Sequence, residues 1–74
     1  MNDDEPTISD DTPVLMARLQ TLRQEHADLD ASIEALRLVP IPDQLLIARL
    51  KRKKLILRDE IVRVEDLILP DIIA

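Results

Sequence analysis

The sequence contains no cysteine, no glycine and no aromatic residue, and its single histidine is His26. Loops that wrap a phosphate need glycine where the backbone takes a positive φ or approaches the ligand closely, so its absence excludes the common nucleotide-binding loops. Without cysteine, and with one histidine, the chain has no zinc knuckle, disulfide or thiol nucleophile. The lack of Phe, Trp and Tyr removes the rings on which single-stranded nucleic acid stacks. We therefore expect no enzyme activity, no catalytic residues, no cofactor and no metal site.

The residues that are present favour helices. Leucine (13), isoleucine (9), alanine (6) and valine (4) dominate a chain of 74 residues that is 34% charged, a composition typical of long helices and coiled coils. Uncharged stretches are short and the N-terminal residues are acidic, so we expect neither a membrane span nor a signal peptide, and a cytoplasmic location. The length leaves room for one domain with a small core.

Charge is unevenly distributed along the chain. Residues 1–12 contain five acidic and no basic side chains, whereas residues 13–74 contain ten of each, so the net charge of −5 belongs to the N-terminal segment. Low hydrophobicity and like charges predict that residues 1–12 form a disordered acidic tail. Residues 70–74 are an apolar C-terminal tail, and the sequence leaves open whether this tail packs on the rest of the chain or is a recognition motif.

Apolar side chains recur in the first half of the chain at alternating spacings of four and three residues, the heptad pattern of a coiled-coil helix. Thr12 and Pro13 suit the start of this helix, because a threonine hydroxyl accepts from free N–H groups and proline has no N–H to leave unbonded. We expect the helix to run from Pro13 to about Arg37. Its seam consists of Leu15, Leu19, Leu22, His26, Leu29, Ile33 and Leu36.

Pro40 and Pro42 prevent this helix from continuing, and Asp43 suits the N-cap of a second helix. The second helix is expected from about Gln44 to Ile68. Its seam consists of Ile47, Leu50, Lys54, Leu57, Ile61, Val64 and Ile68. Two helices of similar length joined by a short corner predict an all-α fold, an antiparallel two-helix hairpin of coiled-coil type over residues 13–69.

In an antiparallel pair of helices, the numbers of facing residues add to a constant. A sum of 79 or 80 brings apolar seam positions together, for example Leu22 with Leu57, and brings the one polar residue of each seam, His26 and Lys54, into the same layer. The same count brings together three pairs of opposite charge: Arg18 with Glu60, Glu25 with Lys53, and Asp30 with Lys51. It also brings together one pair of like charge, Arg23 with Arg58. Agreement between the seam and its flanks favours the hairpin.

The segment from His26 to Glu60 resembles the YdcH-like family of small bacterial proteins, a group of unknown function. The family pattern is roughly H-x-x-L-D-x-x-I-x-x-L, a proline-containing corner, an acidic residue, and then L-K-x-x-K-L-x-L-[KR]-D-E. This chain matches it at His26, Leu29, Asp30, Ile33, Leu36, Asp43, Leu50, Lys51, Lys54, Leu55, Leu57, Arg58, Asp59 and Glu60. The resemblance covers roughly residues 19–74, implies a helical hairpin and implies no activity.

Two polar features compete for a functional role. We interpret the layer of His26 and Lys54 as a device that fixes register, as single polar seam residues do in coiled coils; a catalytic base would need a pocket and a second catalytic group. The basic segment, Arg49 to Lys54, spreads its charges around most of the helix, which is typical of a solvated, salt-bridged face. The alternative is an anion-binding site made by Arg49, Lys51, Arg52 and Lys53.

A second apolar stripe recurs every seven residues beside the second seam, at Ala48, Leu55, Val62 and Leu69. One hairpin cannot cover this stripe, so we expect a homo-oligomer in the form of a helical bundle. The leading hypothesis is a non-enzymatic interaction module that self-associates and binds a protein partner. The alternative is an accessory nucleic-acid-binding protein that uses the segment from Arg49 to Lys54.

Overall fold

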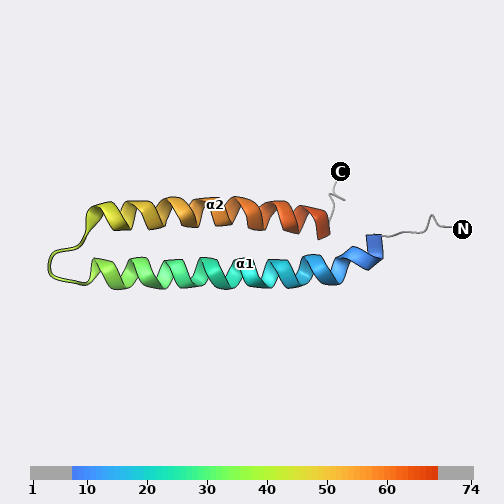
Figure 1. Ribbon diagram of the computed structural model, residues 1–74, viewed down its shortest axis with the longest axis horizontal. Coiled ribbons are helices and arrows are strands. Elements are labelled where there is room, and N and C mark those ends of the chain that lie inside the picture. The colour runs from blue at the N-terminus through green and yellow to red at the C-terminus, as the bar shows by residue number, and fades with distance from the viewer. Residues whose placement is uncertain (1–7, 69–74) are drawn as a thin grey trace, which may run out of the picture.

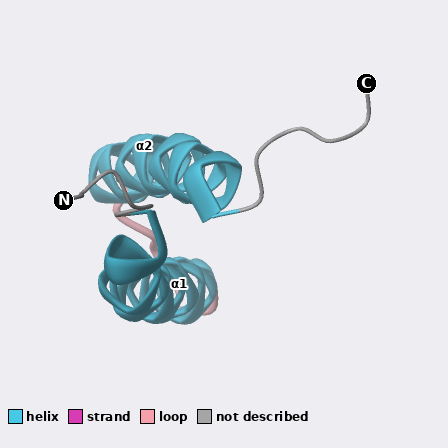
Figure 2. Ribbon diagram, turned by 90° about the vertical axis from the view of Figure 1, so that its right-hand side faces the viewer, coloured by secondary structure: helices cyan, strands magenta, loops and turns pink. Residues whose placement is uncertain are grey.

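The computed structural model describes residues 8–68, which form two helices joined by a short corner. Helix α1 spans Ile8–Arg37 and helix α2 spans Gln44–Ile68. The helices lie side by side and run in opposite directions, so the corner occupies one end of the molecule, while α1 begins and α2 ends at the other, the open end (Figure 1). Viewed from the open end, the two helices appear as two neighbouring cylinders, with α2 above α1 (Figure 2). The expected all-α antiparallel hairpin is confirmed for the described residues.

Helix α1 begins at Ile8, five residues before the expected start at Pro13, so the end of the expected acidic tail is helical. Pro13 is tolerated near the start of a helix, because its missing N–H removes only the bond that would reach the carbonyl of Ser9. Asp11 in the first turn also suits the positive end of the helix dipole. The first turn departs from the axis of the rest of α1 (Figure 1), which agrees with a proline at this place. Residues 1–7 lie outside the described residues.

The corner is closed by backbone hydrogen bonds and a helix cap. The N–H of Leu38 donates to the carbonyl of Ala35 at 3.2 Å, where α1 ends. The carboxylate of Asp43 accepts a hydrogen bond from the N–H of Leu46 at 3.0 Å, and its carbonyl accepts one from the N–H of Ile47 at 3.0 Å. Asp43 is therefore the N-cap that the sequence predicts, since its side chain satisfies a donor that the first helical turn leaves without a partner.

The core is a single seam between the two helices. Four side chains are buried, with exposed fractions of 3–5%: Leu22, Ile33, Ile47 and Val64. Every other predicted seam position in both helices, including His26 and Lys54, is half-buried. The seam assignment is therefore confirmed. No polar or charged side chain is buried among residues 11–68, so the polar layer keeps contact with water.

A pair of identical substitutions measures how much the seam stabilises the hairpin. Ile47→Ala removes a side chain that is 4% exposed, whereas Ile41→Ala removes one that is 88% exposed in the corner. We expect Ile47→Ala to lower the free energy of unfolding by about 2–5 kcal/mol and Ile41→Ala by less than about 0.5 kcal/mol. Urea denaturation followed by circular dichroism measures both; equal losses would contradict a core confined to the seam.

Candidate functional site

Among residues 8–68, three ion pairs join the helices along the flanks of the seam. Arg18 donates to Glu60 at 2.7 Å, Arg23 to Glu65 at 2.8 Å, and Lys54 to Asp30 at 2.6 Å. The expected proximity of Arg18 and Glu60 is confirmed. Two of the pairs join residues that the count of facing positions did not bring together, because Asp30 pairs with Lys54 and Arg23 pairs with Glu65.

The direction in which helical side chains lean accounts for the pairs Asp30 with Lys54 and Arg23 with Glu65. Side chains in a helix tilt toward its N-terminus. In an antiparallel hairpin, a side chain of α1 therefore leans toward the open end and one of α2 leans toward the corner. Charged partners can therefore meet when their residue numbers add to more than the sum for facing backbone positions, as they do for Arg23 with Glu65 and for Asp30 with Lys54. Arg18 and Glu60 pair without this offset, because their numbers add to 78.

The polar layer of the seam is a cluster of three residues. Lys54 is half-buried in the seam, and its long side chain carries the ammonium group out to Asp30 at the edge. The hydrogen bond and the charge of Lys54, with a smaller contribution from the nearby His26, lower the pKa of Asp30. The sequence identified His26 and Lys54 as a layer but missed Asp30, which lies four residues after His26 on the same side of α1.

The described residues contain neither a metal-binding cluster nor a membrane-spanning helix. Across the described part of the chain, no three His, Asp or Glu side chains gather closely enough to hold a metal ion. Neither described helix is long and apolar enough to cross a membrane. The polar layer is an ion pair at the exposed edge of the seam beside a half-buried imidazole, an arrangement that can fix register.

The basic segment of α2 is exposed and largely without partners. Arg49, Lys51, Arg52 and Lys53 are all exposed, and none of the four forms an ion pair with another described residue. Lys54 differs from them because it bonds to Asp30. The structure therefore leaves four cations on the surface of one helix within about 6 Å of helix length.

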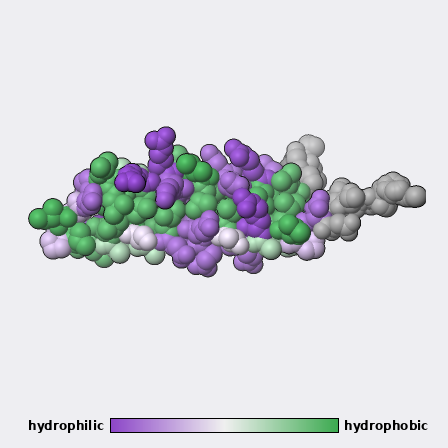
Figure 3. All heavy atoms as spheres, viewed as in Figure 1, coloured by the Kyte–Doolittle hydropathy of each residue, from purple (hydrophilic) through white to green (hydrophobic). Residues whose placement is uncertain are grey.

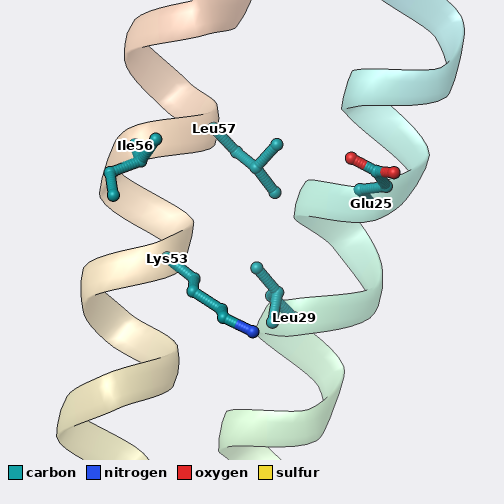
Figure 4. A pocket seen from close by; sticks show the side chains of 5 residues that line it. All are labelled: Glu25, Leu29, Lys53, Ile56 and Leu57. Atoms are coloured by element: carbon teal, nitrogen blue, oxygen red, sulfur yellow. The ribbon is translucent and has the colours of Figure 1, made fainter.

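A groove of about 400 Å³ lies between the helices beside the basic segment. Its floor and walls are Leu29 from α1 and Ile56 and Leu57 from α2, and its rim carries Glu25 and Lys53. Leu57 and Lys53 extend from α2 toward α1 across this space (Figure 4). Glu25 and Lys53 therefore lie on the same groove, as the count of facing residues predicts, but they form no ion pair.

The apolar stripe of α2 is exposed along its described length. Leu55 is 56% exposed and Val62 48% exposed, and Ala48 is also on the surface; Leu69 lies outside the described residues. The further exposed apolar side chains of α2 are Leu45, Ile56 and Leu67. Hydrophobic side chains cover much of the face shown in Figure 3, interrupted by charged ones. The hairpin thus exposes more apolar surface on α2 than its own seam can bury.

The ion pair between Lys54 and Asp30 predicts how the pKa of Asp30 responds to mutation. Because the pKa of Asp30 is lowered in the folded state, the pair stabilises the fold above the ordinary aspartate pKa of 3.8, and this contribution is lost as the pH falls through the lowered value. Lys54→Met should return the pKa of Asp30 toward 3.8, whereas Lys53→Met, which removes an unpaired lysine, should leave it lowered. Carboxyl NMR titration of both variants measures the difference; identical curves would contradict the pairing.

Comparison with known proteins places the chain in a family. The family described as "Protein of unknown function (DUF465)" matches residues 19–65, which includes both seams, the corner and the basic segment. Comparisons with curated proteins and with solved structures found no match. The match agrees with the resemblance to the YdcH-like family and covers most of the hairpin. The chain therefore belongs to the DUF465 family, whose fold in this member is an antiparallel helical hairpin.

Proposed function

We propose that the protein is a non-enzymatic interaction module, a helical hairpin that self-associates through the stripe on α2 and presents its remaining surface to a protein partner. The observation that carries this proposal is the exposure of Leu55 and Val62 on the same side of α2, with Ala48 one heptad before them. Apolar residues scattered singly on a surface need no explanation, but a heptad repeat along a helix is the pattern of a helix-packing surface.

The small core supports the same conclusion. Only four side chains are buried among residues 11–68, and all of them belong to one seam. Each large apolar side chain contributes about 1.5–3 kcal/mol when it is fully buried, while ordering each residue costs about 1.5 kcal/mol. A second copy that covers the stripe adds buried apolar area without ordering a new segment of chain.

Charges beside the stripe favour an antiparallel pairing of α2 with the α2 of a second copy. Residues 49–58 contain six basic and no acidic side chains, whereas residues 59–68 contain four acidic and one basic side chain. With Leu55 opposite the second copy's Val62, facing residue numbers add to 117, so the antiparallel direction places Arg52 near the second copy's Glu65 and Asp66. A parallel pairing in register would place the basic residues 49–58 beside the same residues of the second copy. The antiparallel direction therefore brings more opposite charges together.

One observation also favours a second candidate function, nucleic-acid binding by the basic segment. Arg49, Lys51, Arg52 and Lys53 are exposed and unpaired within the described residues. Their charges point in several directions around α2, and the net charge of −5 opposes non-specific attraction to phosphates. A mobility shift on duplex DNA or RNA that weakens with added salt would support this second function.

Two matched double variants test self-association. Leu55→Lys with Val62→Lys places two charges in the stripe and should convert an oligomer into a monomer of 8.5 kDa with a weaker helix signal. Ala27→Lys with Ala31→Lys adds the same charge at exposed positions of α1 and should leave the assembly unchanged. Sedimentation equilibrium at tens of micromolar distinguishes these outcomes; a wild-type chain that is monomeric there would contradict the proposal.

A further inference from the structure

The corner carries the most exposed apolar side chains of the described residues. The members of this corner patch are Leu38, Val39, Ile41 and Leu45. Ile41 is 88% exposed and Leu38 79% exposed, more than any large apolar residue of the stripe. Ile41 lies between Pro40 and Pro42, which restrict the backbone conformations of the corner. The patch shares no residue with the stripe, so covering the stripe does not explain it.

Free positive charge surrounds this patch. The segment from Asp30 to Lys54 contains six basic and three acidic side chains, whereas the rest of residues 8–68 contains four basic and eight acidic side chains. Two of the three acids near the corner are engaged, because Asp30 bonds to Lys54 and Asp43 caps α2. Within this segment, the cations that form no ion pair with another described residue are Arg37, Arg49, Lys51, Arg52 and Lys53. The hairpin is therefore a rod that is positive at its corner and negative over the rest of its length.

We propose that the corner is a docking tip for an anionic lipid surface. The apolar patch enters the boundary between headgroups and acyl chains, and the cations behind it contact the anionic headgroups. Such insertion reaches about 5–10 Å into a bilayer. At 1.5 Å per residue, Arg49 lies about 8 Å along α2 from its first residue, so a tip inserted to that depth brings Arg49 to the level of the headgroups.

The combination of apolar and cationic groups selects this occupant. A nucleic acid supplies phosphates for Arg49 and Arg52 but offers no apolar phase for Ile41 and Leu38. A neutral lipid surface offers the apolar phase but does not attract the cations. The negative remainder of the chain is repelled by an anionic surface and orients the rod with its corner toward that surface. The self-association proposed above is not required for this docking.

The absence of aromatic residues provides a sensitive test, because a single introduced tryptophan is the only one in the chain. In the Ile41→Trp variant, the full chain is mixed with phosphatidylcholine vesicles that contain about one-third phosphatidylglycerol. The fluorescence emission of the introduced tryptophan should then shift to shorter wavelength, and the tryptophan should be protected from iodide quenching. Vesicles of phosphatidylcholine alone should produce no shift. Ile56→Trp, at an exposed position of α2 outside the patch, is the control and should not shift on either vesicle.

Binding measurements on the same vesicles separate insertion from simple attraction. Ile41→Asp should weaken vesicle binding at least about tenfold, whereas Ile56→Asp, with its fold checked by circular dichroism, should change it little. Each of the variants Arg49→Gln and Arg52→Gln should weaken vesicle binding about fivefold, and this effect should be smaller at high salt. Equal loss for the two aspartate variants, or no binding to anionic vesicles, would overturn the proposal. Binding to duplex DNA or RNA without binding to vesicles would also overturn it and would favour the nucleic-acid function.

Discussion

The single seam between α1 and α2 is the constraint on which the rest of the structure depends. With two helices, each helix can bury only one stripe of side chains, and the stripes meet at Leu22, Ile33, Ile47 and Val64. No third element covers the outer surface of either helix in residues 8–68. Apolar residues outside the seam therefore remain in water unless another molecule covers them. The seam thus accounts both for the hairpin and for the apolar surface that remains exposed on α2 and at the corner.

Charge on the flanks of the seam specifies how the two stripes meet. At Asp30 with Lys54 the acid lies on α1 and the base on α2, and nearer the open end Arg18 with Glu60 reverses the two signs. Exposed ion pairs contribute little stability each. Their arrangement still opposes a shifted register, because a shift along the seam brings like charges together. Apolar burial thus stabilises the hairpin, while the alternation of charge and the Asp43 cap specify one arrangement of it.

Residue spacing predicted the seam, the corner and the Asp43 cap, because each depends on local periodicity or on the backbone preferences of proline and aspartate. Spacing failed where side-chain direction decides the outcome. Counting facing positions locates backbones, and it missed that Lys54 extends out of the seam to Asp30. It also placed the start of α1 at Pro13, although a proline near a helix start removes few bonds. The groove between the helices was not predicted, since it depends on the shapes of Leu29 and Leu57 in three dimensions.

The two proposed surfaces of the hairpin constrain one another. In an antiparallel pairing through the stripe, Leu55 lies opposite the second copy's Val62, and the corners of the two copies point in opposite directions. Two such corners cannot both enter one flat lipid surface from an end-on orientation. A dimer of this kind therefore docks through one corner and leaves the other free, or it joins two surfaces. The antiparallel direction that the charges of α2 favour thus determines what an assembled hairpin can contact, because it separates the two docking tips by the length of the pair.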